Sequence, residues 1–134
     1  MSADFELVAV GAHMHGLPLN SELLALGAEF RRALNTAPLY RLYLLPGGPP
    51  ARPGLLRVSP DEGVAVAVEV WALPTAKVGA LLARVPSPLG FGAVRLADDS
   101  APIGFLAEAA GVRGAPDISC YGGWRGFLAA RTDA

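Results

Sequence analysis

The pattern of hydrophobic and polar positions predicts a domain built mainly from β-strands. Residues 64–73 ("VAVAVEVWAL") are rich in valine and carry little polarity on either face, which is typical of a strand at the centre of a sheet. Residues 5–10 ("FELVAV") form a second apolar run that ends at a glycine, and we interpret it as a buried first strand. Further strands are predicted at residues 28–37, 39–45, 55–58 and 118–121, with a hairpin formed by 91–96 and 103–109.

Three short helices are predicted, at residues 20–26, 77–85 and 124–130. The first begins where Asn20 or Ser21 can cap it, and Gly27 can end it. The segment 46–54 ("PGGPPARPG") is too rich in proline for regular structure, and we expect a surface excursion there. Together the elements predict a single α+β domain over residues 1–134, a small β-barrel or curved mixed sheet with packed helices.

Composition and charge narrow the range of functions. The chain has 134 residues, of which 52% are hydrophobic and 17% are charged, so it can bury one core and is not disordered. The net charge is −1 and Lys77 is the only lysine, which leaves no basic cluster for nucleic acid. No apolar run approaches the roughly 20 residues that span a bilayer, and no signal peptide is evident. We therefore expect a cytoplasmic protein without nucleic-acid or membrane partners.

Both histidines of the chain, His13 and His15, lie in the loop that follows the first predicted strand. Such loops often carry functional residues, and Gly11 and Gly16 allow the backbone to approach a ligand. Consecutive N–H groups ahead of a helix suit an anion, and an imidazole beside them can donate a proton at neutral pH. The alternatives are a structural histidine or a pair of metal ligands. Zinc needs further ligands that no spacing selects, so we expect no metal and no cofactor.

Other residues are weaker candidates for a pocket wall. Glu69 interrupts the valine-rich strand, and it either pairs with an arginine, faces solvent, or is a site acid with a raised pKa. Arg41 shares a strand face with Tyr43 and can bind a carboxylate or extend along the surface, whereas Tyr40 faces the opposite way. Tyr121 precedes a Gly-Gly pair. The single thiol, at position 120, has no neighbouring base in the sequence, and we expect it to be buried and inert.

Segments spread over nearly the whole chain resemble the C-terminal domain of allophanate hydrolase. In chain order they are "VGAHMHGLPLN", "TAPLYRLYLL", "PPARPGLLRV", "VEVWALP", "PSPLGFGAVRLADD", "GFLAEAAG" and "YGGWRGFLA". The resemblance implies a fold like that of γ-glutamylcyclotransferases, a small β-barrel with helices. It also implies decarboxylation of N-carboxycarbamate, which an amidase domain produces from allophanate. The catalytic histidine of the family's "GAH" motif corresponds to His13.

The leading hypothesis is therefore a decarboxylase of N-carboxycarbamate or a related small dicarboxylate, in urea or allophanate-type nitrogen metabolism. His13 would be the proton donor, and the backbone of Gly11, Ala12 and Met14 would contact the carboxylates. The pocket wall would include Tyr40, Arg41, Glu69 and Tyr121. Because 134 residues leave no space for an amidase domain, a separate amidase is expected to supply the substrate.

Two alternatives stay open at this point. One is a non-catalytic module that binds an amidase or forms a homodimer, since the high apolar content makes an exposed interface plausible. The other is an enzyme similar to γ-glutamylcyclotransferases. These enzymes have a Tyr-Gly-Ser type of loop after the first strand and a glutamate on the helix that follows the central strand. Here the loop reads "VGAH" and residues 74–85 contain no acid, so Glu69 or Glu108 would have to substitute.

Overall fold

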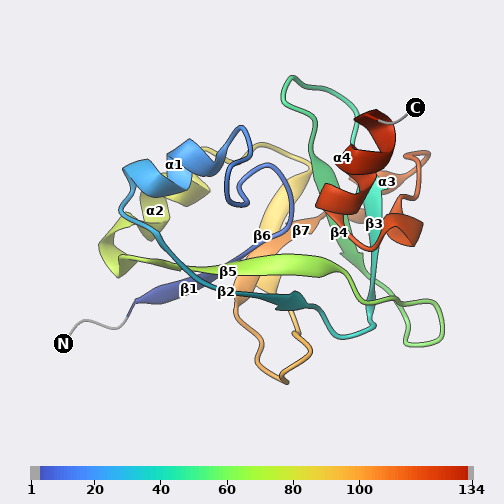
Figure 1. Cartoon of the computed structure of the whole chain (residues 1–134), viewed down its shortest axis with the longest axis horizontal. Helices are drawn as coiled ribbons and strands as arrows, with labels where there is room; N and C mark the ends of the chain where they lie inside the picture. The colour runs from blue at the N-terminus through green and yellow to red at the C-terminus, as the bar shows by residue number, and fades with distance from the viewer. Residues whose placement is uncertain (1–3, 133–134) are drawn as a thin grey trace.

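The computed structural model describes residues 4–132 and contains a five-stranded mixed sheet, a two-stranded sheet and short helices (Figure 1). The strands are β1 (Phe5–Ala9), β2 (Glu29–Asn35), β3 (Tyr40–Leu44), β4 (Pro53–Arg57), β5 (Ala67–Leu73), β6 (Leu89–Ala93) and β7 (Ile103–Ala107). The α-helices are α1 (Asn20–Ala25), α2 (Val78–Leu82), α3 (Ala109–Val112) and α4 (Trp124–Thr132), and the 3₁₀ helices are η1 (Thr75–Lys77) and η2 (Ser119–Tyr121). The predicted α+β class is confirmed.

The large sheet has the strand order β2-β5-β1-β7-β6. β5 pairs antiparallel with both β1 and β2, and β1 is parallel to β7. The central position predicted for the valine-rich strand is thus confirmed, and residues 68–73 are buried. Beyond β2 and β6, hydrogen bonds between residues 35–37 and 95–97 bring the two edges together. The mixed sheet therefore closes on itself at this end.

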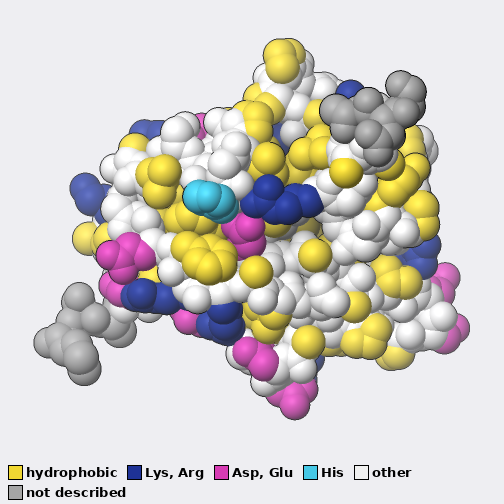
Figure 2. Space-filling model, in the orientation of Figure 1, with side chains coloured by type: hydrophobic (Ala, Val, Ile, Leu, Met, Phe, Trp, Pro, Cys, Tyr) yellow, Lys and Arg dark blue, Asp and Glu magenta, His cyan; other side chains and the backbone are white. Residues whose placement is uncertain are grey.

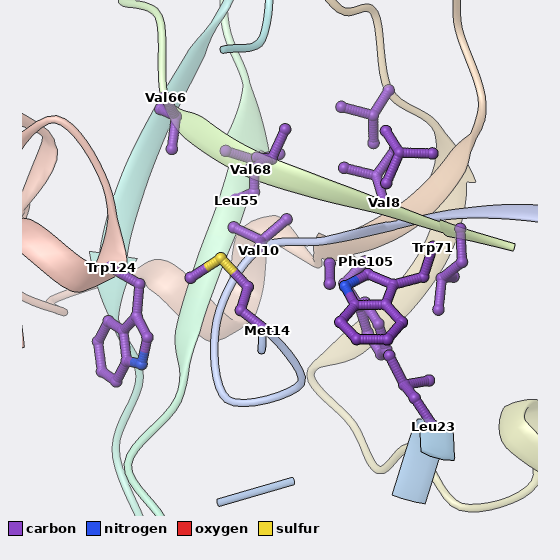
Figure 3. Close-up of a cluster of buried hydrophobic side chains, with 14 of the residues drawn as sticks. Val8, Val10, Met14, Leu23, Leu55, Val66, Val68, Trp71, Phe105 and Trp124 are labelled. Carbon is purple, nitrogen blue, oxygen red and sulfur yellow. The ribbon is translucent and has the colours of Figure 1, made fainter. Parts of the chain in front are cut away.

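The core holds the loop after β1 as well as the strands. Figure 3 shows Met14 in the same cluster of side chains as Val10 and Leu55, with Trp71 and Trp124 farther out on either side. Met14 is only 3% exposed, although it lies outside any regular element. Because its side chain is buried, the middle of this loop is anchored to the core. The residues on both sides of Met14 are the two histidines.

Several predicted elements are wrong in type or extent. The strand predicted at 103–109 ends at Ala107 and is followed by helix α3, and the strand predicted at 91–96 is β6, Leu89–Ala93. Residues 118–121 form the 3₁₀ helix η2 instead of a strand, because Asp117 accepts the N–H of Ser119 at 2.9 Å and favours a turn. Gly122 ends η2 with a φ of 81°, and α4 follows. The excursion predicted at residues 46–54 ends early, because β4 begins at Pro53. Proline is tolerated at the first position of a strand.

Two predicted side-chain roles are also wrong. Asn20 does not cap α1, whose N-cap is Leu19 without a side-chain hydrogen bond. The Asn20 amide instead donates to the carbonyl of His13 at 2.9 Å, so it ties the helix to the loop. The thiol of Cys120 is exposed, because η2 turns it outward.

Within residues 4–132, no helix is both long and apolar enough to cross a membrane.

Candidate active site

His13 lies in the loop that follows β1 and is buried, with 8% of its surface exposed. Its Nε2 atom lies 3.0 Å from Oε1 of Glu22 on α1. The ring stacks on Phe105 of β7, with 4.8 Å between centroids and 17° between planes. A carboxylate only accepts hydrogen bonds, so Nε2 carries a proton and Nδ1 is free of one when the ring is neutral. The side chain is therefore fixed in both orientation and tautomer.

The protonation of His13 depends on opposing influences. Burial lowers the pKa of His13 below 6.5, the hydrogen bond and charge of Glu22 raise it, and the charge of Arg52 lowers it further. Burial prevails, so the imidazole of the free protein is neutral at neutral pH. A negatively charged ligand in contact with the ring would shift this pKa upward, because it stabilises the imidazolium.

The titration of His13 predicts a dependence of stability on pH. The folded protein binds this proton less readily than the unfolded chain, so the contribution of neutral His13 is complete above pH 6.5 and is lost as the pH falls through the folded pKa. We expect the free energy of unfolding of the wild type to fall more between pH 7.5 and 5 than that of His13→Gln. Urea unfolding at both pH values measures this difference. Equal losses in the two proteins would contradict the lowered pKa.

A cleft of about 270 Å³ opens beside His13 and Glu22. Its other lining residues are Leu19, Gly48, Pro49, Pro50, Arg52, Arg84, Val85, Pro86 and Leu89. Neither Arg52 nor Arg84 has a hydrogen-bond or ion-pair partner for its guanidinium within residues 4–132. Two cations and one acid thus line a cleft of small-molecule size, and this surplus of positive charge suits a small anion.

Some predicted site residues meet at this cleft. Gly11, Ala12 and His13 line a small recess that Phe105 and Arg52 also border. Met14 contributes differently from the prediction, because its side chain is buried in the core and its N–H donates to the carbonyl of Gly11 at 2.9 Å. A contact of the Met14 N–H with a ligand would compete with this turn.

Glu69 and Tyr121 line a second cleft, of about 250 Å³, together with Met14 and Arg125. It shares no lining residue with the cleft of His13. The exposed side chain of His15 does not line this cleft but a neighbouring hollow, which it shares with Phe30, Ala33 and Glu69. Figure 2 shows a histidine next to a basic and an acidic side chain, surrounded by hydrophobic ones, in agreement with these contacts. The loop therefore directs its two histidines to different clefts.

Glu69 is ionised and paired with Arg125, which agrees with the first of the alternatives that the sequence left open. Burial alone would raise the pKa of Glu69, but hydrogen bonds from the His15 N–H, the Arg125 guanidinium and the Trp71 indole together lower it. The alternative of a site acid with a raised pKa is wrong, because three donors stabilise the charged form.

Tyr40 and Arg41 line neither of these two clefts. Tyr40 is fully buried and its hydroxyl accepts the N–H of Arg95 at 2.8 Å. The Arg41 guanidinium donates to Asp117 at 2.7 Å and to the carbonyl of Glu62 at 3.0 Å. Both side chains thus have structural partners away from His13.

Sequence reasoning missed Glu22, Arg52 and Arg84 as residues of the cleft. Its place in the sequence could have pointed to Glu22, which is an acid in the first turn of the helix that follows the histidine loop. Arg52 lies in the proline-rich segment, which predicts a surface excursion without chemistry. Within residues 4–132, no group of three or more His, Cys, Asp or Glu side chains is placed to hold a metal ion.

The close approach of β1's end to β4 requires glycine at position 11. A Cβ atom on Gly11 would lie 2.2 Å from Cδ and 2.5 Å from Cγ of Pro53, whose ring cannot rotate away. We expect Gly11→Ala to lower the free energy of unfolding by about 1–3 kcal/mol, as overpacking does. Urea unfolding measures the loss. Gly79→Ala is the matched control, because beyond the neighbouring backbone of its own helix nothing lies within 4 Å of the added methyl, and it should cost nothing.

Fold and site together define an α+β domain in which the loop after the first strand holds a buried histidine in a cleft with two arginines. Residues 5–129 match the model of the allophanate hydrolase C-terminal domain. The chain belongs to this family.

Relatives extend the match over nearly the whole chain. Urea amidolyase of Saccharomyces cerevisiae is 37% identical over 130 residues, which cover 95% of this chain and 7% of that protein. Allophanate hydrolase of Kluyveromyces lactis has a TM-score of 0.91 at 34% identity, covering 96% of this chain and 21% of that one. A protein described as specific to uropathogenic E. coli has a TM-score of 0.87 at 35% identity, covering 95% of this chain and 97% of that one. This fold therefore occurs both within much longer chains and in a chain of similar length.

Proposed function

We propose that this domain decarboxylates N-carboxycarbamate, or a related small dicarboxylate, with His13 as the proton donor. The observation that carries the proposal is the position of the His13 imidazole in a cleft where the guanidinium groups of Arg52 and Arg84 have no partner among the residues that the structure describes. Arginine binds carboxylates through paired N–H donors, so Arg52 and Arg84 can each hold one carboxylate of such a substrate. The volume of about 270 Å³ fits a molecule of this size.

The proposed step is simple in its balance of atoms and charge. N-carboxycarbamate carries two carboxylates on one nitrogen. The bond between this nitrogen and one carboxyl carbon breaks, its electron pair stays on the nitrogen, and carbon dioxide leaves. The nitrogen takes a proton, so the second product is the carbamate anion. Carbamate then takes up a second proton, from solvent, and releases ammonia and a second carbon dioxide. No oxidant, reductant or metal is needed for this balance.

His13 can supply the proton once the substrate is bound. The free imidazole is neutral, but a dianion beside it raises the pKa of the ring and promotes uptake of a proton from solvent. Glu22 holds Nε2–H and stabilises the imidazolium, much as a carboxylate orients histidine in other general acid–base sites. Nδ1 then carries the proton that can be transferred. Stacking on Phe105 keeps the ring in place during the transfer.

The source of the substrate would be an amidase that hydrolyses allophanate. The relatives named urea amidolyase and allophanate hydrolase carry this domain within longer chains, which supports a place in urea or allophanate metabolism. N-carboxycarbamate is short-lived, so we propose that the amidase acts close to this domain, as a separate protein or as another part of the same chain.

Carbon dioxide release from N-carboxycarbamate tests the proposed reaction. An isolated allophanate amidase generates the substrate in situ from ¹³C-labelled allophanate, and ¹³C NMR follows its decay with and without the domain. The arm without the domain gives the spontaneous rate. His15→Ala is a matched control, because it removes an imidazole that lies outside the cleft. We expect wild type and His15→Ala to accelerate the decay equally. Decay at the spontaneous rate with wild type would refute the reaction.

The position of Glu22 supports a second candidate function, an activity similar to that of γ-glutamylcyclotransferases. Its carboxylate reaches the loop after β1, as a general acid–base glutamate would. This glutamate comes from α1, whereas the expected one lies after the central strand. Incubation with a γ-glutamyl amine distinguishes the two activities, since cyclotransferase chemistry releases 5-oxoproline and the free amine. Absence of both products excludes this candidate for the amine used.

A further inference from the structure

The backbone of His15 is held on both sides by a charged pair from distant elements. Its N–H donates to Oε1 of Glu69 on β5 at 2.8 Å. Its carbonyl accepts from the Arg125 guanidinium of α4 at 2.7 Å. The same guanidinium nitrogen donates to the other oxygen of Glu69 at 2.9 Å. Glu69, Arg125 and the peptide groups of His15 therefore form a closed ring of hydrogen bonds.

The ring is built to be rigid. The Glu69 side chain is 9% exposed, and its Oε1 also accepts the Trp71 indole N–H at 3.1 Å. All the bonds to this carboxylate are charge-assisted, and such bonds are about twice as strong as neutral ones. With three donors, the carboxylate has little capacity left for a ligand. We therefore assign Glu69 a role in holding the loop.

His13 is two residues away from the held peptide groups, and its position depends on them. The intervening Met14 side chain is fixed in the core. On the other side, Asn20 donates to the carbonyl of His13 at 2.9 Å, and Leu19 donates to that of Ala12 at 2.8 Å. The loop is thus tied to α1 at one end and to β5 and α4 at the other. Loosening either end would let the imidazole move away from Glu22 and Phe105.

We propose that Glu69 and Arg125 are positioning residues, which hold the imidazole of His13 in the cleft by clamping the backbone of His15. The kinetic consequence rests on the proposed decarboxylation, whereas the structural consequence does not. A misplacement of about 1 Å can slow a reaction as much as 100-fold. Here Asn20 and Met14 still restrain the loop, so a smaller loss, on the order of tenfold in kcat, is expected.

The test uses a protein with one imidazole. His15→Ala removes the only other histidine, so the remaining imidazole signal in ¹H NMR belongs to His13. The substitution keeps the backbone N–H and carbonyl that form hydrogen bonds with Glu69 and Arg125. In this background the pKa of His13 is measured by pH titration, alone and with Arg125→Ala, Glu69→Gln or Arg31→Ala. Arg31 is the matched control, because its ion pairs with Asp4 and Glu29 are exposed and do not involve the loop.

We expect the single His15→Ala protein and its Arg31→Ala derivative to titrate alike, below pH 6.5. With Arg125→Ala or Glu69→Gln, the midpoint of the His13 titration should move toward 6.5, because a displaced imidazole regains contact with water. In the decarboxylation assay, kcat should fall about tenfold with KM changed less than about twofold, since positioning acts on the chemical step. Arg125→Lys keeps a donor and should restore part of the loss.

The proposal would be overturned by a folded Arg125→Ala protein in which both the His13 titration and kcat are unchanged. Arg125 is 48% exposed in its side chain, so this variant should fold, and thermal melting checks it. If it does not fold, Arg125→Lys decides instead. If the wild type fails to release carbon dioxide, the proposed function fails while the titration still decides the positioning role.

Discussion

Replacing His13 with alanine is expected to reduce the acceleration of carbon dioxide release by at least about 100-fold, the usual contribution of a general acid. The variant removes the only imidazole of the cleft and leaves Arg52 and Arg84 to bind the substrate. Binding should therefore persist while proton transfer is lost, so kcat falls and KM changes little. The measurement is the ¹³C NMR decay of N-carboxycarbamate, with the spontaneous rate subtracted.

Two further variants make this result specific to proton transfer. His13→Gln keeps a donor for Glu22 and most of the ring's volume but cannot deliver a proton, so it should be as inactive as His13→Ala. His15→Ala should retain wild-type activity, because its side chain lies on the other side of the loop. The pH profile adds a check, since kcat of the wild type should decline as the pH rises above the pKa of His13 in the complex. Activity of His13→Gln within a few-fold of wild type would eliminate the proton-donor role.

Sequence patterns predicted the sheet well because its strands are defined by composition. The valine content of β5 and the apolar run of β1 require burial on both faces, which places them at the centre. η2 was missed because a hydrogen bond from the Ser119 N–H to the Asp117 carboxylate favours a turn over an extended chain. When a local side-chain hydrogen bond outweighs strand propensity, the pattern of hydrophobic and polar residues does not change, so the sequence does not reveal it.

The candidate site was only partly predictable for a different reason. His13 stands out in the sequence because it follows an apolar strand within a glycine-flanked loop. Its partner Glu22 is nine residues away, and the partner of Glu69 is 56 residues away, so both contacts depend on tertiary structure. Tyr40 shows a false prediction instead of a missed residue. Its hydroxyl suggested a place in the pocket wall, but the side chain is buried in the core. Alternation assigns residues to two faces but does not say which face meets a cleft.

Removing both arginines of the cleft should abolish the preference for a dicarboxylate. A charge-assisted hydrogen bond to a carboxylate contributes about 1.5–3 kcal/mol, so each loss weakens binding by about 10-fold or more. The double variant Arg52→Gln/Arg84→Gln should thus raise the Kd for a dicarboxylate by at least about 100-fold, because the two side chains bind separate groups. Glutamine keeps polar N–H donors, which isolates the effect of charge.

Stable model anions allow this measurement without turnover. Malonate has one atom between its two carboxylates, like N-carboxycarbamate, and acetate has a single carboxylate. Isothermal titration calorimetry should show tighter binding of malonate than of acetate to the wild type, and little difference between them in the double variant. Arg57→Gln is the matched control, because it removes an exposed positive charge that does not line the cleft. If malonate binds the double variant as tightly as the wild type, the arginines do not hold the carboxylates, and the positive charge of the cleft has another purpose.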